Sequence, residues 1–182
     1  MTAHQAALEA LTRYFGYDSF RPGQQGIVEA LLAGRDVLGV MPTGAGKSVC
    51  YQIPAALSPG MTLVISPLIS LMRDQVDVLN DLGLPAAFIN TTQTPDEQAM
   101  VFAQAAAGQI KLLYVAPERL ETGRFRDFAA RTPISLIAVD EAHCVSQWGQ
   151  DFRSSYLGIG DFIAGLPQRP PVGAFTATAT ER

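Results

Sequence analysis

The chain has 182 residues, enough for one domain with a core of its own. Hydrophobic residues make up 48% and charged residues 16%, and the net charge of −4 argues against a protein that coats nucleic acid through a broad basic face. No stretch has the length of a transmembrane helix, and the N-terminus carries no signal-peptide pattern. We therefore expect a cytoplasmic protein without membrane contact.

Helix-like and strand-like segments alternate along the chain. The periodicity predicts helices over 3–15 and 24–33, and strands that alternate with helices indicate a mostly parallel sheet joined by right-handed crossovers. The expected strands lie near 37–41, 62–66, 86–90, 110–115, 134–139 and 172–176, and further helices are clearest at 68–82, 95–107 and 155–165. The pattern predicts an α/β fold over 1–182 with helices on both faces of the sheet, but not its strand order.

Residues 41–48 read Met-Pro-Thr-Gly-Ala-Gly-Lys-Ser and lie between an apolar run at 36–40 and a short helix-like segment at 49–57, interrupted or bent near Pro54. A glycine-rich loop between a strand and a helix surrounds phosphates with N–H groups, and its lysine and hydroxyl serve the outer phosphates and Mg²⁺. Met41 stands where the general pattern has glycine. We expect the phosphates of a nucleotide at Thr43, Gly44, Ala45, Gly46, Lys47 and Ser48.

Asp140 and Glu141 follow the apolar run 134–139, which is typical of a strand buried on both faces. Ligands of open α/β sheets bind at the carboxyl ends of strands. We expect Asp140 and Ser48 to hold Mg²⁺, and Glu141 to polarise the attacking water. The alternative, a solvated acidic turn, is disfavoured by the upstream loop. With Lys47, these carboxylates are the expected catalytic residues of a P-loop NTPase.

Cys50 and Cys144 have no partners at metal-ligand spacing. Two cysteines in a reducing compartment indicate no disulfide framework. We therefore interpret both as small buried hydrophobes.

Further segments have no general motif, but together they resemble RecQ-type DNA helicases of superfamily 2. The resemblance rests on 15–17 with 20–24, the loop 41–48 with its methionine, 66–75, 114–120, Asp-Glu-Ala-His at 140–143 with the aromatic-rich loop 144–153, and 175–180. It covers nearly the whole chain, and the aromatic-rich loop is its most specific part. It implies a RecA-like fold, ATP and Mg²⁺ as cofactors, and 3′–5′ DNA unwinding in DNA repair and recombination.

The same resemblance implies that Tyr17, Arg21 and Gln24 read the base. Gln24 offers an amide and a carbonyl to adenine N7 and N6, which would select ATP over GTP. Tyr17 and Arg21 offer an aromatic face and a planar cation. Phe20 is interpreted as a hydrophobic anchor between the first two helices, and Tyr17 has the same alternative.

Trp148, Phe152 and Arg153 gather stacking and cationic groups on an expected loop. Bases of single-stranded DNA stack on aromatic side chains, so this loop is expected to contact DNA. The alternative is that Trp148 packs onto the core. By resemblance, the signal passes to the ATP site through Gln147 and His143.

Three other segments have two possible roles each. Thr176 and Thr178 either link the DNA and ATP sites through their hydroxyls or cap the sheet edge. The turns after Ser66 and around Pro117 either present N–H groups to DNA phosphates or are ordinary strand-to-helix turns.

The resemblance also implies partners that this sequence does not contain. Such helicases close the ATP site between two lobes, and an arginine finger from the second lobe is worth roughly 10³–10⁵ in rate. We expect a first motor lobe without the second lobe, the zinc-binding domain or the accessory DNA-binding domain, inactive or weakly active alone. Its expected partners are single-stranded DNA or duplex junctions and the second lobe, at the nucleoid in a bacterium.

Three alternatives remain open at this point. The first is another superfamily 2 enzyme such as an RNA helicase, against which the loop around Trp148 argues. The second is a transporter-type ATPase, although no Leu-Ser-Gly-Gly-Gln signature occurs. The third is a non-catalytic nucleotide-binding module.

Overall fold

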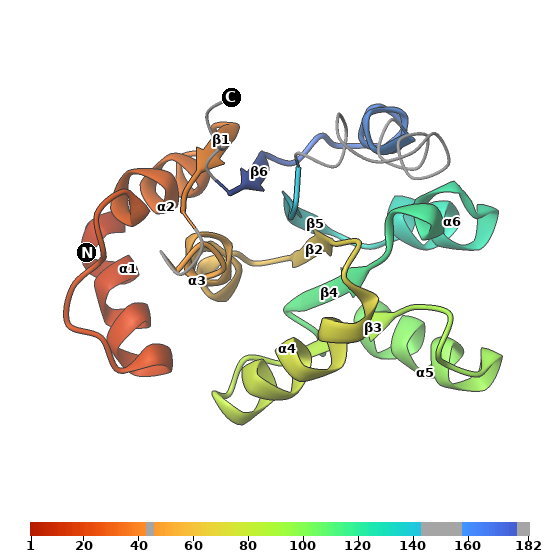
Figure 1. Cartoon of the computed structure of the whole chain (residues 1–182). Coiled ribbons are helices and arrows are strands. Elements are labelled where there is room, and N and C mark those ends of the chain that lie inside the picture. Colours follow the sequence, from red (N-terminus) through yellow and green to blue (C-terminus); the bar gives the residue numbers. More distant parts are fainter. Residues whose placement is uncertain (43–45, 143–157, 178–182) are drawn as a thin grey trace.

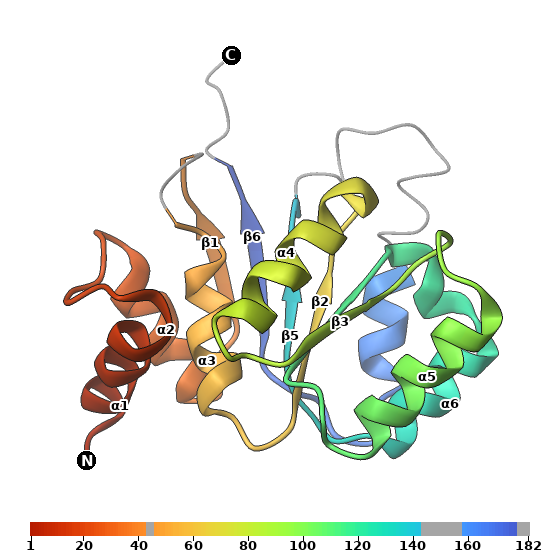
Figure 2. The same cartoon turned by 90° about the horizontal axis from the view of Figure 1, so that it is seen from below.

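A computed structural model describes residues 1–42, 46–142 and 158–177, and a six-stranded sheet forms its centre (Figure 1). The strands are β1 (Val37–Val40), β2 (Met61–Ile65), β3 (Ala86–Ile89), β4 (Leu112–Val115), β5 (Ile134–Val139) and β6 (Val172–Thr176). Their order is β1-β6-β5-β2-β4-β3, and every pairing is parallel, so the strands run in one direction (Figure 2). The predicted α/β fold is confirmed, and its six strands lie where the sequence placed them.

The strands are joined by helices, as the alternating pattern predicts. The α-helices are α1 (Ala3–Ala10), α2 (Gln24–Leu32), α3 (Val49–Leu57), α4 (Ile69–Asp81), α5 (Pro95–Ala106) and α6 (Gly123–Arg131). A π-helical turn η1 (Leu11–Phe15), a 3₁₀ turn η2 (Pro117–Glu121) and helical residues 158–164 complete the described elements. None of the helices within these described ranges is long and apolar enough to cross a membrane.

Helices cover both faces of the sheet (Figure 1). On the central strand β2, Leu63 packs on the side of α5, α6 and 158–164, whereas its neighbour Val64 packs on the side of α3 and α4. Both side chains are fully buried, as expected for a strand covered on two faces. Helix α1 packs against α2 and α3 instead of the sheet. Edge strand β1 leaves Leu38 and Val40 largely exposed.

Two helices differ from the prediction. The first was expected as one helix over 3–15, but α1 ends at Ala10 and a π-helical turn continues to Phe15, where Gly16 follows at φ 74°. Helix α6 was not among the helices named in the prediction, because it has only nine residues and four of them, Arg124, Arg126, Asp127 and Arg131, are charged. Thr122 begins it by accepting the N–H of Phe125.

Candidate active site

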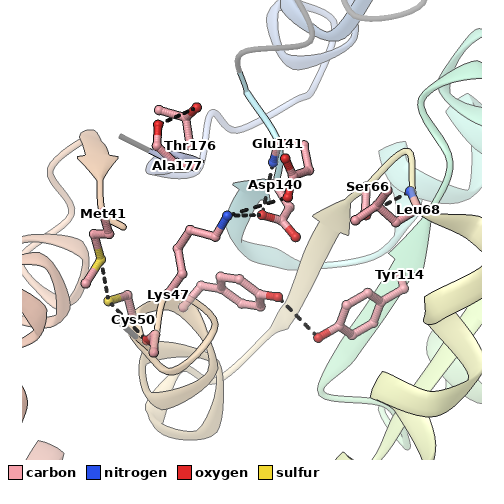
Figure 3. Close-up of polar contacts among 12 residues, drawn as sticks. Met41, Lys47, Cys50, Ser66, Leu68, Tyr114, Asp140, Glu141, Thr176 and Ala177 are labelled. Carbon is pink, nitrogen blue, oxygen red and sulfur yellow. Dashed lines mark hydrogen bonds and ion pairs between the residues drawn. The ribbon is translucent and has the colours of Figure 1, made fainter. Parts of the chain in front are cut away.

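The fold brings the loop lysine and the acidic pair together. Strands β1 and β5 end at the same edge of the sheet with β6 between them. Lys47 Nζ lies 3.6 Å from Asp140 Oδ1 and 3.5 Å from Glu141 Oε1, and its side chain extends toward both carboxylates (Figure 3). A cation and two carboxylates, distant in sequence, therefore form one cluster.

The start of α3 holds Lys47 and Ser48 in place. Gly46 has φ 75°, a left-handed conformation that glycine adopts without strain. Ser48 is the N-cap residue, and its carbonyl accepts the N–H of Gln52 at 2.9 Å. The helix then continues through Pro54 to Leu57, so the expected interruption does not occur. Its N-terminus adds partial positive charge next to Lys47.

Asp140 is a buried carboxylate at the end of β5. Its main-chain N–H donates to the carbonyl of Ile65 on β2 at 2.9 Å, which fixes its position. The pKa of the Asp140 carboxyl is raised, mainly by burial and also by the charge of Glu141. Lys47 and the hydrogen bond from the Glu141 N–H act in the opposite direction. A charged Asp140 is therefore stabilised by any cation that lies beside it.

The donors at this point suit Mg²⁺. Within the described ranges, no group of three or more His, Cys, Asp or Glu side chains is arranged to hold a metal ion. Mg²⁺ is usually bound by one or two protein oxygens together with waters and phosphate oxygens. A single carboxylate at Asp140, with the Ser48 hydroxyl, fits that preference.

Glu141 has a strained backbone. Its φ is 55°, the only positive value of a residue other than glycine in the described ranges. This conformation costs roughly 1–2 kcal/mol for an L-residue. The Glu141 N–H donates to Asp140 Oδ1 at 3.0 Å, and the next N–H, of Ala142, donates to Phe175 O at 2.8 Å. These bonds hold the strained turn that directs the Glu141 carboxylate toward Lys47.

Two of the three expected base-reading residues, Arg21 and Gln24, lie beside Gly46. Gln24 is 3% exposed, and its Oε1 accepts the Arg21 N–H at 2.8 Å while its Nε2 donates to Gly46 O at 3.0 Å. Arg21 Nη1 also approaches Gly46. Tyr17 is 51% exposed. A groove of about 600 Å³ runs past Arg21 and along β1.

A sulfur pair beneath the loop was not predicted as part of the site. Cys50 Sγ lies 3.7 Å from Met41 Sδ and 3.9 Å from Gly46 O (Figure 3). Burial raises the pKa of the Cys50 thiol to about 12, so the thiol stays protonated. The prediction that Cys50 is a buried hydrophobe is confirmed. The only feature of the sequence that pointed to this sulfur contact was the methionine at position 41, where the general motif has glycine.

A buried polar cluster below Asp140 was also missed. The hydroxyls of Tyr51 and Tyr114 lie 3.4 Å apart, and Gln52 Nε2 lies 3.5 Å from the Tyr114 hydroxyl. Burial is the main cause that raises the pKa of both tyrosines, so both are neutral. Tyrosines in an apolar segment gave no sign of this pairing, because it joins α3 to β4.

The remaining expected residues are placed as follows. Phe20 packs against the cluster between α1 and α2, so its role as an anchor is confirmed. Thr176 Oγ1 donates to Ala177 O at 3.3 Å, and its carbonyl accepts the Met41 N–H at 3.0 Å. Ser66 Oγ accepts the Leu68 N–H at 3.2 Å, and Pro117 begins η2. Thr43, Gly44, Ala45, His143, Gln147, Trp148, Phe152, Arg153 and Thr178, as well as Cys144, lie outside the described residues.

Comparison with known proteins decides the family. Residues 21–182 match the sequence model of the DEAD/DEAH box helicase family. The chain belongs to this family. It is 51% identical over 173 residues to the ATP-dependent DNA helicase RecQ of Haemophilus influenzae. The aligned region covers 95% of this chain and 28% of that protein. It is 47% identical over 175 residues to RecQ of Bacillus subtilis, covering 96% and 30%. The chain thus spans less than a third of the length of these relatives.

Solved structures show the same fold at low identity. The Mycobacterium smegmatis helicase Lhr bound to ssDNA and AMP-PNP aligns with a TM-score of 0.70 at 21% identity, over 96% of this chain and 24% of that one. A hypothetical ATP-dependent RNA helicase from Sulfolobus tokodaii aligns with 0.71 at 21%, over 97% and 51%. At this identity the likeness establishes a RecA-like helicase fold and nothing more specific.

Proposed function

We propose that this chain is the ATP-binding first motor lobe, residues 1–182, of a RecQ-type 3′–5′ DNA helicase that acts in DNA repair and recombination. The observation that carries the proposal is the cluster of Lys47 with Asp140 and Glu141 at the end of β5. The 51% identity to a RecQ helicase over 95% of the chain supports the choice of DNA helicase over RNA helicase. We place the protein in the cytoplasm, at the nucleoid in a bacterium.

Each member of the cluster has one task. Lys47 neutralises the outer phosphates of ATP, assisted by the N–H groups of the loop 43–46. Ser48 and Asp140 hold Mg²⁺, which when bound neutralises charge that develops on the phosphates. Glu141 orients and polarises the attacking water. In this scheme Lys47, which contacts the two carboxylates here, would pair with phosphate, and a cation held by Asp140 and Ser48 would offset the carboxylate charge in its place.

Gln24 selects adenine because its amide has a fixed orientation. The Arg21 N–H identifies one side of the amide as the acceptor, and the Gly46 carbonyl identifies the other as the donor. Adenine presents an acceptor at N7 and a donor at N6, whereas guanine presents two acceptors on the same edge. Tyr17 and Arg21 then contact the base with an aromatic face and a planar cation.

DNA contact and full catalysis depend on further segments. Trp148, Phe152 and Arg153 contact single-stranded DNA, and Gln147, His143, Thr176 and Thr178 transmit that contact to the ATP site. The second lobe supplies the arginine finger, so this lobe alone binds ATP weakly, hydrolyses it slowly and does not unwind DNA. Robust unwinding by the purified chain would contradict this division.

Calorimetric titration with Mg²⁺-ATP and Mg²⁺-GTP tests the nucleotide site directly. We expect the chain to prefer ATP, Lys47→Ala to lose binding, and Gln24→Ala to bind the two nucleotides alike. Lys111→Ala is the matched control, because Lys111 lies at the opposite edge of the sheet, where its ammonium donates to Ser58 O. Its affinity for ATP should equal that of the unmodified chain.

Two outcomes would overturn parts of the proposal. Equal binding of GTP by the unmodified chain would remove the adenine assignment of Gln24. Unchanged ATP binding by Lys47→Ala would remove the nucleotide site itself.

The nucleic acid is tested on a protein that contains the second lobe as well as this one. Its ATPase rate should rise with single-stranded DNA far more than with single-stranded RNA, and the reverse would favour an RNA helicase.

A further inference from the structure

Two buried tyrosine hydroxyls meet in the core near Asp140. Tyr51 in α3 is 1% exposed and Tyr114 in β4 is fully buried, and both belong to the apolar cluster on one face of the sheet. Their hydroxyls lie 3.4 Å apart, and Gln52 Nε2 lies 3.5 Å from the Tyr114 hydroxyl. The negative charge of Asp140 contributes to the raised pKa of both tyrosines, so the pair lies within electrostatic reach of that carboxylate.

The stability of the fold does not explain these two hydroxyls. A hydrogen bond between oxygens is usually about 2.5–3.0 Å long, so a contact at 3.4 Å is weak. Burying a hydroxyl among apolar side chains costs free energy, and a weak bond offsets that cost only in part. Phenylalanine has nearly the same shape without this cost. The hydroxyls of Tyr51 and Tyr114 therefore define a particular arrangement of α3 on the sheet and add little to stability.

One end of this contact lies in the first turn of α3. The N–H groups of Tyr51 and Gln52 donate to the Ser48 carbonyl at 3.2 and 2.9 Å. The side chains of the same two residues reach Tyr114, whose ring points from β4 toward the start of α3 (Figure 3). The position of Ser48 is thus connected to β4 through residues of a single helical turn.

The other end of the contact lies in the sheet that carries Asp140. Tyr114 pairs with Val64 on β2, and Val64 pairs with Ala138 on β5, two residues before Asp140. A row of paired strands keeps these positions at fixed separations. The tyrosine contact therefore joins the helix that presents Ser48 to the sheet that presents Asp140.

We propose that Tyr51 and Tyr114 are positioning residues that set the separation between the Ser48 hydroxyl and the Asp140 carboxylate. Mg²⁺ demands near-ideal octahedral geometry, so a small rotation of α3 weakens a site with one oxygen on the helix and one on the sheet. The affinity for Mg²⁺-ATP then depends on the two hydroxyls. Metal-free ATP is held by Lys47 and the loop, and its affinity depends on them less. This inference rests on the proposed ATP site and adds two residues to it.

A double variant, Tyr51→Phe with Tyr114→Phe, separates positioning from stability. It removes both hydroxyls together, so neither is left without its partner, and the urea midpoint of unfolding should equal or exceed that of the unmodified chain. Calorimetric titration with ATP, once with Mg²⁺ and once with EDTA, gives the ratio of the two affinities. We expect this ratio to fall about tenfold in the double variant, as for the loss of a group that supports a metal ligand.

Tyr14→Phe is the matched control, because it also removes one phenol hydroxyl. Tyr14 lies in η1, is half-buried, and its ring is contacted by the Arg13 guanidinium. The ratio of affinities should not change in this variant. Tyr114→Phe alone leaves the Tyr51 hydroxyl without its partner, so it should lower both the ratio and the urea midpoint.

The outcomes distinguish this inference from the proposed function. An unchanged ratio in the folded double variant would overturn the positioning role and leave the ATP site intact. An equal fall of the ratio in Tyr14→Phe, or a double variant that unfolds at much lower urea concentration, would also overturn it. If the unmodified chain binds no ATP, or binds it equally with and without Mg²⁺, the assignment of Ser48 and Asp140 fails and this inference fails with it.

Discussion

The side of the sheet at which the parallel strands end, here the carboxyl edge, and the side at which they begin, the amino edge, are built in different ways. At the carboxyl edge, uppermost in Figure 2, Asp140 is buried and Glu141 has a strained φ of 55°. At the amino edge, Arg169 holds Asp36 with two bonds of 2.8 and 3.0 Å, and Val172 N–H donates to the same carboxylate. Both of these side chains are more than half exposed. Desolvated charge and strain are thus concentrated where chemistry is proposed, whereas the charged pair of the amino edge is exposed and hydrogen-bonded.

A substitution at the amino edge should therefore lower the stability of the protein without weakening its binding of nucleotide. A Cβ at Gly60 would lie 2.8 Å from the backbone oxygen of Pro133 and 2.6 Å from Ser135 Oγ. We expect Gly60→Ala to lower the free energy of unfolding by about 2 kcal/mol through overpacking, with unchanged ATP affinity of the folded protein. Urea unfolding and calorimetry measure the two quantities.

Gly123→Ala is the control for this substitution. No atom lies within 4 Å of a Cβ at Gly123, at the start of α6, and its φ is not positive. Alanine there should leave stability equal or slightly higher. If Gly60→Ala is as stable as Gly123→Ala, the amino edge is looser than the structure indicates.

The carboxyl edge should show a distinctive loss of stability at alkaline pH. The pKa of Cys50 is raised from 9.0 to about 12 by burial, so the folded protein keeps a proton that the unfolded chain loses above pH 9. A raised folded pKa contributes stability that is complete below the unfolded value and is lost as the pH rises. Between pH 8 and 10, Cys50→Ala should therefore lose about 1.4 kcal/mol less unfolding free energy than the unmodified chain. Parallel curves for the two proteins would show that the thiol is not desolvated.

Strain at Glu141 gives a smaller effect of opposite sign. We expect Glu141→Gly to raise the free energy of unfolding by about 1 kcal/mol relative to Glu141→Gln, because glycine adopts φ 55° without cost. Both substitutions remove the charge that faces Lys47, so their difference isolates the backbone. Both should abolish ATP hydrolysis when measured in a protein that also contains the proposed second lobe. Equal stability of the two variants would mean that the turn relaxes in solution.

The smallest effect is expected at the exposed pair of the amino edge. Hydrogen bonds from Arg169 and from the Val172 N–H lower the pKa of Asp36 below its usual 3.8. A lowered folded pKa contributes stability that is present above the unfolded value and is lost as the pH falls. The slight advantage of the unmodified chain over Asp36→Asn should therefore exist at pH 6 and disappear below about pH 3.8, as measured by thermal unfolding. An advantage that persists at pH 2 would exclude the charge as its cause.

Elements with strong local signals were predictable from the sequence. The apolar run 134–139 is a strand buried on both faces, and it appears as β5 within the predicted bounds. Helix α5 was predicted over 95–107 and spans Pro95–Ala106, and in the structure Thr94 and Glu97 form a capping box at its start. Helix α6 was missed because it is short and carries four charged residues among nine, and packing of Phe125, Phe128 and Ala129 on the core stabilises it.

The sequence by itself determined the α/β class and the two motifs of the site, because periodicity and loop chemistry are local properties of the chain. Only the tertiary structure placed β6 between β1 and β5 and brought Lys47 within 3.6 Å of Asp140. It also joined Gln24 to Gly46 and desolvated Cys50. These features depend on which side chains of distant segments exclude water from one another, and that is settled only when the sheet and its covering helices pack together.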